Sequence, residues 1–265
     1  MKARVMTFRV ALASCVGVSA LISLAGCKAG GGAGGGSVQT GSTQQPVTVG
    51  QEQGVEKQKP APGTGNVQGT VLYNGKPVGN IKVKLCEKFN RFFGGCDGKI
   101  FTAQTESDGV YVIANVPPNT YEALTAQVFD TDMYVFATSG VGGLSSEKYE
   151  VKADKTLFIT PTNLFKDDLR IVSPKAGSKV SAQGLVLKWQ PYPDAAYYKF
   201  TLYAQEPGTV SPYINQRTEE TSAALDKPMP KGEYRIEVEA YNSNDKKLAE
   251  CADDLKFTIT DGTAQ

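Results

Sequence analysis

From residue 66 onward, apolar and polar residues alternate over short stretches separated by turn residues, and no helical period is sustained. Alternation with a period of two is typical of strands with one buried face. Glycine, asparagine and proline gather at 74–77, 107–109 and 117–119, where they favour turns. Many short strands at this spacing predict a β-sandwich over 66–162. The expected strands cover 68–73, 80–86, 99–105, 110–115, 122–129, 134–138, 149–151 and 156–160.

A second run of the same pattern follows from residue 166. Its expected strands cover 169–174, 185–189, 198–202, 234–240 and 256–260. The only tryptophan, Trp189, lies in the second of these stretches. The fold class that the pattern predicts is therefore all-β, with two tandem β-sandwiches over 66–162 and 166–261.

The N-terminal segment has a different pattern. Three basic residues within 1–9 precede an apolar stretch over 10–24, and small residues then precede Cys27. A basic start, a short apolar core and small residues at its end are typical of a secretory signal peptide. A transmembrane helix is the alternative, but 10–26 is short beside the roughly 20 residues that span a bilayer.

Leu24, Ala25, Gly26 and Cys27 resemble the lipobox of bacterial lipoproteins. The resemblance implies that a signal peptide over 1–26 is removed and that Cys27 carries acyl chains, palmitate among them. Each buried methylene contributes about 0.8 kcal/mol, and stable anchoring takes more than one chain. An aspartate after the cysteine retains enterobacterial lipoproteins in the inner membrane. Lys28 stands there instead, which implies a lipid anchor in the outer membrane of the cell envelope, on its periplasmic side or its surface.

Residues 27–65 separate this anchor from the first predicted sandwich. A glycine-rich run over 30–36 is followed by serine, threonine, glutamine and proline, with few apolar side chains. Such a segment cannot bury enough surface to offset the entropy of ordering it. We expect a flexible tether that spans roughly 30–40 Å.

Composition narrows the chemistry. The chain has a formal net charge of +1, and 1–26 contains three cations and no acidic residue, so the chain from Cys27 onward carries −2. A basic stripe for nucleic acid is absent. The chain has no histidine, which excludes Ser-His-Asp and Cys-His mechanisms and the usual zinc enzymes. Adjacent carboxylates at 167–168, 219–220 and 253–254 would point to opposite faces of a strand. We therefore expect no enzyme, no cofactor and no metal.

The first predicted sandwich resembles a carboxypeptidase regulatory-like domain, over roughly 66–160. The matching residues are Gly69, Thr70, Val71, Gly75, Pro77, Val78, Val83 and Leu85, then Thr105, Asp108, Gly109, Tyr111, Val116, Pro117 and Tyr121. The chain departs from that pattern at Asn119, where glycine is usual. The resemblance implies a transthyretin-like sandwich, non-catalytic, of a kind found in cell-surface and outer-membrane proteins.

Cys86 and Cys96 form an isolated pair within this region, which in an exported protein predicts a disulfide. The loop between them carries three aromatic rings and a cation: Phe89, Arg91, Phe92 and Phe93. The rings either fold back and cap the end of the sandwich or form a contact patch for a partner. The sequence favours capping and leaves the contact patch open.

The second predicted sandwich resembles a fibronectin type III domain, over roughly 166–261. Trp189 would lie in the core on the second strand, and Leu225, Pro228 and Tyr234 match the tyrosine corner of such sandwiches. Cys251 has no partner in this region and is expected to be a small buried hydrophobe, with an intermolecular disulfide as the alternative.

Alternation along 197–203 places Tyr197 and Tyr203 on the outward face of their strand. Outward tyrosines can stack on sugar rings, although tyrosine is also a common strand former. The sequence therefore predicts a non-enzymatic envelope lipoprotein, anchored in the membrane, whose sandwiches are structural and bind an envelope protein. The alternative is a lipoprotein that binds polysaccharide through these tyrosines or through the Phe89–Phe93 loop.

Overall fold

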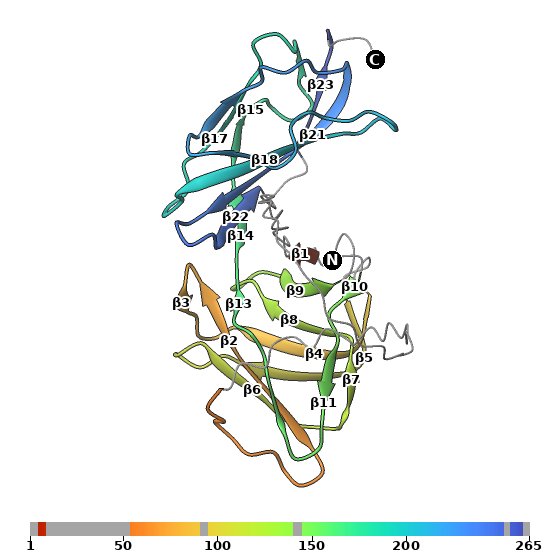
Figure 1. The fold of residues 1–265 in the computed structure, drawn as a ribbon, viewed down its shortest axis with the longest axis vertical. Coiled ribbons are helices and arrows are strands. Elements are labelled where there is room, and N and C mark those ends of the chain that lie inside the picture. The colour runs from red at the N-terminus through yellow and green to blue at the C-terminus, as the bar shows by residue number, and fades with distance from the viewer. Residues whose placement is uncertain (1–4, 9–53, 91–94, 140–144, 252–254, 262–265) are drawn as a thin grey trace, which may run out of the picture.

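The computed structural model describes residues 5–8, 54–90, 95–139, 145–251 and 255–261, and these residues form strands and turns without a helix. Two hydrophobic cores, one around Val71 and one around Trp189, define two units. The units lie end to end along the longest axis of the molecule (Figure 1). The all-β class predicted from the sequence is confirmed. The predicted cleavage site with Cys27, and the loop residues Arg91, Phe92 and Phe93, lie outside the described residues.

The first unit is a sandwich of two sheets with the core between them. One sheet is built on β2, which β6, β12, β13 and β3 flank. The facing sheet has the order β1-β9-β8-β4-β5, and β10 also pairs with β9. The bounds in the first sheet are β2 (Gly65–Tyr73), β3 (Lys76–Pro77), β6 (Val110–Val116), β12 (Thr156–Phe158) and β13 (Thr162–Asn163). Those in the second are β1 (Val5–Phe8), β4 (Lys82–Asn90), β5 (Gly95–Gln104), β8 (Ala123–Gln127), β9 (Tyr134–Ser139) and β10 (Ser145–Ser146). A separate two-stranded antiparallel sheet is formed by β7 (Asn119–Tyr121) and β11 (Tyr149–Val151).

The turns of this unit lie where the sequence predicts them. Asn74 and Gly75 both have positive φ, 51° and 73°, and join β2 to β3 in a two-residue hairpin turn. Gly109 has a φ of 75°, and a Cβ added there would lie 2.7 Å from the carbonyl oxygen of Val71. Only glycine therefore fits at this turn before β6.

The second unit is also a two-sheet sandwich. A three-stranded sheet, β15-β17-β20, faces a larger one in the order β14-β22-β21-β18-β19, in which β23 pairs with the first half of β21 and β22 with its second half. The smaller sheet contains β15 (Ile171–Ser173), β17 (Val186–Trp189) and β20 (Ser222–Ala224). The larger contains β14 (Lys166–Leu169), β16 (Lys179–Val180), β18 (Tyr197–Ala204), β19 (Gln216–Thr218), β21 (Gly232–Tyr241), β22 (Lys247–Cys251) and β23 (Leu255–Ile259).

Trp189 lies in the core of the second unit, as predicted, and is 3% exposed. The predicted tyrosine corner is also present, because the hydroxyl of Tyr234 donates to the carbonyl oxygen of Pro230 at 3.0 Å. The first unit contains the same device: the Tyr121 hydroxyl donates to the Pro117 carbonyl oxygen at 2.9 Å. The hydrogen bond between Tyr121 and Pro117 was not predicted from the sequence.

The expected strand over 169–174 is corrected by the structure. It is two strands, β14 and β15, which belong to opposite sheets of the second unit. β14 pairs in parallel with β22, whereas β15 pairs antiparallel with β17. The break falls at Arg170, where the chain crosses from one sheet to the other. Leu169 and Ile171 continue one apolar alternation across the break, so the pattern alone did not reveal it.

Candidate interaction surfaces

The disulfide between Cys86 and Cys96 is confirmed and joins β4 to β5, with a Cα–Cα distance of 5.2 Å. Beyond it, Phe89 is half-buried and packs edge-on against Phe136 of β9, with ring centroids 4.7 Å apart. The backbone N–H of Phe89 donates to a carboxylate oxygen of Glu122 at 3.0 Å. Phe89 therefore packs back onto its own sheet, against a residue that is buried but does not belong to the first core.

Tyr197 and Tyr203 lie outside the core of the second unit, on the face that the alternation predicts. The expected exposure of Tyr197 needs correction, because this residue is only 3% exposed. One ring face stacks on Tyr241, at 5.1 Å between centroids and 2° between planes. The guanidinium of Arg217 lies 3.8 Å from the ring centroid. Neither face of the Tyr197 ring is therefore open to a sugar.

The hydroxyl groups of this stack are held by carboxylates. Tyr197 donates to Asp245 at 2.8 Å, and Tyr241 donates to Glu239 at 2.8 Å. Burial, and then the hydrogen bond to Asp245, raises the pKa of Tyr197 to about 12. Lys199 lies 4.6 Å from the centroid of the Tyr241 ring and adds a second cation to the stack. The arrangement stabilises the sheet internally.

Tyr203 is half-buried and lies further along β18. The guanidinium of Arg235, its cross-strand partner on β21, lies 4.3 Å from the centroid of its ring. A cation therefore occupies one ring face here as well.

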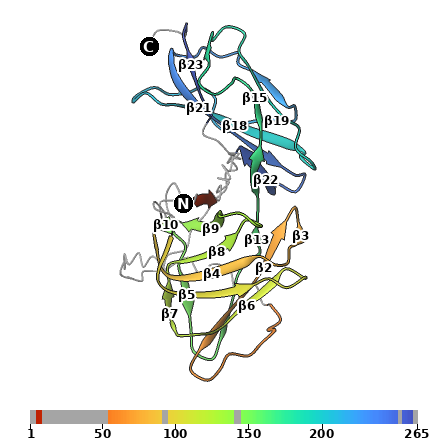
Figure 2. The same ribbon diagram turned by 180° about the vertical axis from the view of Figure 1, so that it is seen from behind.

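The junction between the two units consists of two consecutive strands. β13 adds to β2 of the first unit, and β14 adds to β22 of the second. Only Leu164 and Phe165 separate these strands, and both are fully buried in the first core. The backbone N–H of Leu164 donates to the carbonyl oxygen of Leu72 at 2.7 Å. The chain thus passes between the units without a free linker, a continuity visible in both views (Figures 1 and 2).

Polar side chains also cross the junction. Asn74, in the β2–β3 turn, donates to Asp194 at 2.8 Å and accepts from Asn242 at 2.7 Å. The hydroxyl groups of Tyr73 and Tyr192 lie 3.4 Å apart, and Tyr192 donates to Asp168 at 2.8 Å. These contacts hold the β2–β3 end of the first unit against the second.

Lys247 forms a largely buried ion cluster at the same junction. Its ammonium contacts the carboxylates of Glu239 and Glu250, and its side chain is 11% exposed. It also lies 4.2 Å from the centroid of Phe165, which belongs to the first core. Burial alone would lower the pKa of Lys247, but the two carboxylates outweigh it and raise the pKa above the usual value. The backbone carbonyl of Lys247 accepts from Asn163 at 3.0 Å.

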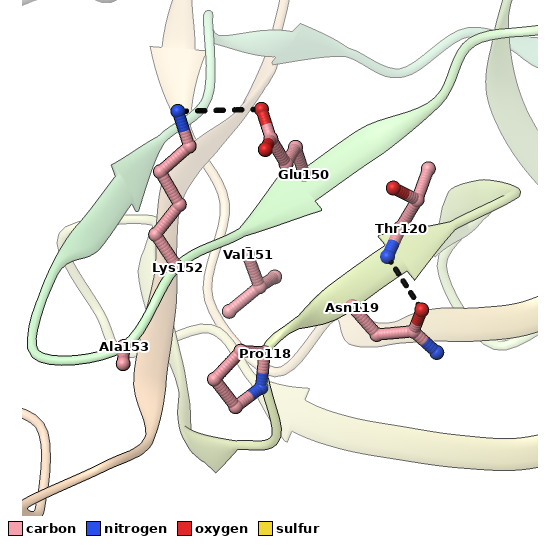
Figure 3. A pocket seen from close by; sticks show the side chains of 7 residues that line it. All are labelled: Pro118, Asn119, Thr120, Glu150, Val151, Lys152 and Ala153. Carbon is pink, nitrogen blue, oxygen red and sulfur yellow. Dashed lines mark hydrogen bonds and ion pairs between the residues drawn. The ribbon is translucent and has the colours of Figure 1, made fainter.

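A shallow hollow lies between β7 and β11 (Figure 3). Lys152 and Glu150 pair across 3.4 Å at its rim, and the N–H of Thr120 donates to the side chain of Asn119. These polar groups are exposed and already satisfied by one another. The hollow is lined by Pro118, Asn119, Thr120, Glu150, Val151, Lys152 and Ala153.

Cys251 is half-buried rather than fully buried as expected, and it has no disulfide partner. Its sulfur accepts from the N–H of Val238 at 3.4 Å and lies 3.8 Å from the carbonyl oxygen of Ile236. Burial raises the pKa of its thiol to about 11. A second hollow beside it is lined by Asp167, Asp168, Leu169, Arg170, Ile171, Cys251 and Leu255.

Across the described ranges, no group of three or more histidine, cysteine, aspartate or glutamate side chains could hold a metal ion. In the same part of the chain, no helix is long and apolar enough to cross a membrane.

These features define a protein of two tandem β-sandwiches. No family model and no curated protein matches the chain. Among solved structures it is similar to fibronectin(III)-like modules of CbhA from Clostridium thermocellum, at 14% identity and a TM-score of 0.27, over 74% of this chain and 91% of that one. It is also similar to a candidate carbohydrate-binding protein from Bacteroides uniformis, at 12% identity and a TM-score of 0.25, over 72% of this chain and 95% of that one. The FN1–FN3 domains of chicken CNTN1 match at 15% identity and a TM-score of 0.26, over 69% and 56%. Values this low carry no conclusion about function.

The residues that hold the junction, Asn74, Asn163 and Lys247, were not predicted from the sequence. The signal that could have found them is Leu164-Phe165, an apolar pair placed where two units separated by a free linker would have polar residues. The ion cluster left a weaker signal, since β22, which carries Lys247 and Glu250, was not among the expected strands, and the third member, Glu239, lies on β21.

Proposed function

We propose that this protein is a lipid-anchored lipoprotein of the bacterial envelope, in which two β-sandwiches form a stiff, non-enzymatic module that holds a partner protein. The anchor is Cys27, which follows a removable signal peptide and precedes the tether. The tether, predicted over 27–65, ends before Lys57, because the ammonium of Lys57 contacts Glu106 and Asp108 of the first unit and its backbone N–H donates to the side chain of Gln68. Outer-membrane location follows from Lys28. The first unit is a transthyretin-like sandwich of the carboxypeptidase regulatory-like kind, and the second is of the fibronectin type III kind.

The observation that carries this proposal is the junction between the two units. Inter-domain motion is the normal expectation where a flexible linker joins two domains. Here β13 and β14 follow one another with two buried residues between them, and Lys247 contacts groups of both units. A stiff pair on a flexible tether presents its surfaces at a set distance from each other, which suits a spacer and docking role.

Disulfide formation supports an exported protein as well. The Cys86–Cys96 bond joins β4 to β5 near the connection between these two strands, where Phe89 also lies. Disulfides persist in oxidising compartments such as the periplasm and the cell surface and are rare in the cytosol. The pair therefore fits the destination that the lipobox implies.

Polysaccharide binding through outward tyrosines remains the alternative function, but no feature of the geometry favours it. Tyr197 is covered on both faces, and Arg235 lies over one face of the Tyr203 ring. A sugar would have to displace one of these cations before it could stack.

The test is cross-linking in intact cells, followed by affinity purification of the full-length protein and mass spectrometry. We expect a single protein partner in near-stoichiometric yield from the membrane fraction. The control is Cys27→Ser, which removes the acyl acceptor and should lose both the membrane association and the partner. Recovery of saccharide without a protein partner would contradict the proposal and favour the alternative.

A further inference from the structure

The chain runs along the outer face of β2 before it turns back and enters that strand. Val67 and Val71 of β2 belong to the first core. Because successive side chains of a strand point to opposite faces, Asn66 and Gln68 lie on the outer face of the sheet. Both of these polar side chains are nevertheless buried. Residues 54–60 lie against them, and we call this segment the strap.

Side-chain amides hold the backbone of the strap much as a neighbouring strand would. The Gln68 amide accepts from the backbone N–H of Lys57 at 2.9 Å and donates to the carbonyl oxygen of Val55 at 2.8 Å. The Asn66 amide donates to the carbonyl oxygen of Gln58 at 2.7 Å. The strap therefore runs antiparallel to β2. It turns back into β2 at the end of the first unit that lies away from the junction (Figures 1 and 2).

An ionic contact, which we call the clasp, also holds the strap. The ammonium of Lys57 lies 2.7 Å from the carboxylate of Glu106 and 2.8 Å from that of Asp108, in the turn before β6. All three side chains are partly or largely exposed to solvent. Exposed ion pairs are weak and are screened by salt. The clasp is therefore a contact that opens at a small cost in free energy.

The strap buries little apolar surface. None of residues 54–60 belongs to the first core, and Val55 is 90% exposed. Gly54 lies against the ring of Phe158, since a Cβ added to Gly54 would come within 2.6 Å of that ring. The groups beneath the strap at Asn66 and Gln68 are polar, so water can replace the hydrogen bonds that the strap makes with them. A segment held in this way opens at a lower free energy than the strands beneath it.

We propose that the strap releases from β2 while the sandwich stays folded, and that the clasp controls this release. Release transfers residues 54–60 to the tether and lengthens its reach by up to about 25 Å. Tension on an anchored tether acts at Gly54, so the hydrogen bonds to Gln68 break before the one to Asn66. The proposal rests on the proposed function only in requiring that the tether is anchored at Cys27.

The test is amide hydrogen exchange, followed by nuclear magnetic resonance, in the protein as cells produce it. The amide of Lys57 reports on the strap, and the amide of Val71, which donates to the carbonyl oxygen of Gly109, reports on β2. We expect the Lys57 amide to exchange at least about 100-fold faster than that of Val71, yet roughly tenfold slower than an unstructured amide. Low concentrations of urea should accelerate Val71 alone, because only its exchange requires the unit to unfold.

A matched pair of double variants tests the clasp. Glu106→Gln/Asp108→Asn removes both negative charges that face Lys57. Asp130→Asn/Asp132→Asn makes the same change of charge at exposed residues outside the clasp. We expect the first variant to speed exchange at Lys57 roughly threefold and the second to leave it unchanged, with the β2 amide unaffected in both. Salt at about 0.5 M should speed exchange at Lys57 in the wild type and not in the first variant.

Exchange at Lys57 in step with that of Val71 at every urea concentration would overturn the proposal, because the strap would then leave only when the unit unfolds. Exchange at the rate of an unstructured amide would overturn it as well, since the strap would not be docked in solution. Equal exchange at Lys57 in the two double variants would show that the clasp does not control release. An N-terminal peptide without acyl chains would defeat the proposed function and leave the exchange result standing, so the two failures can be told apart.

Discussion

At the scale of single residues, two tyrosines hold their units in the same way. Tyr121 and Tyr234 each donate a hydrogen bond to the carbonyl oxygen of a proline four residues earlier, and both rings are buried. Tyr121 ends β7 and Tyr234 lies near the start of β21, and each bond ties its strand to the residues that precede it. The residues that make the bond were visible in the sequence, but in the first unit nothing in the pattern indicated which groups the hydroxyl would reach.

We predict that Tyr121→Phe and Tyr234→Phe each lower the free energy of unfolding by about 1 kcal/mol, because each deletes one hydrogen bond and leaves a carbonyl without its donor. Urea unfolding followed by far-ultraviolet circular dichroism measures the first, and Trp189 fluorescence reports the second. Phe101→Leu is the control that distinguishes packing from the hydrogen bond, because it removes the ring contact with Tyr121 and keeps the tyrosine hydroxyl. Unchanged midpoints in both tyrosine variants would contradict the assignment.

Burial raises the pKa of the Cys251 thiol and so lowers its reactivity. With a pKa of about 11, against an ordinary value of 9.0, its thiolate fraction at pH 8 falls roughly 100-fold. We predict that a thiol reagent labels it about 100-fold more slowly than a small free thiol, and that the rate rises with pH up to about pH 11. The measurement uses the processed chain with Cys27→Ser, in which Cys251 is the only unpaired cysteine. Labelling as fast as a small thiol at pH 8 would show that the sulfur is not buried.

At the scale of elements, the strongly alternating stretches were predicted well, and the short ones were not. β6 and β21 alternate between more and less buried residues over most of their length, and the positions of both, like those of β2 and β4, overlap the expected strands. β16 and β19 have two or three residues, too few for a period, and they form because neighbouring strands offer partners. The shortness of β19 also explains the wrong expectation for Tyr197. The alternation along its strand placed Tyr197 correctly on the outward face, but Arg217, which covers its ring, lies on β19, a strand that was not predicted.

The stapled hairpin is the element whose stability is most easily tested. The disulfide closes a loop with a sequence separation of 10, for which the chain-entropy model gives about 3 kcal/mol. We predict that reductant lowers the free energy of unfolding of the first unit by this amount and leaves the second unit unchanged. Hydrogen exchange at the amides of β4 follows the first unit, and Trp189 fluorescence follows the second. The double variant Cys86→Ala/Cys96→Ala should be insensitive to reductant. A loss below about 0.5 kcal/mol in the wild type would contradict the prediction.

At the scale of the whole molecule, we expect the contacts at the junction to hold the two sandwiches together as one stiff body. The sequence pattern divided the chain into two β regions, and the apolar pair Leu164-Phe165 was the only signal that their junction would be tight. Rigidity depends on Asn74, Asn163 and Lys247, polar residues that are far apart in sequence and meet only when both units are folded.

We predict that Lys247→Met destabilises the protein by about 3 kcal/mol, because Glu239 and Glu250 then remain partly buried without their cation. Urea unfolding with Trp189 fluorescence measures the loss, and the exposed neighbour Lys246→Met is the matched control. Since the pKa of Lys247 is raised above 10.5, the lysine's contribution is present below pH 10.5 and is lost as pH rises through its folded-state pKa. On the acid side, the ion pairs with Lys247 are lost as the carboxylates protonate, and burial raises the pKa of Glu250. Equal stability of the two variants at pH 7 would contradict a structural role for the cluster.

The central claim, a lipid-anchored envelope protein, is tested most directly by mass spectrometry of the N-terminal peptide of the protein isolated from cell membranes. The account predicts a chain that begins at Cys27 and carries acyl chains on its sulfur and amino group, while Cys27→Ser remains unacylated. A chain that retains residues 1–26, or one that begins at another residue without lipid, would contradict it.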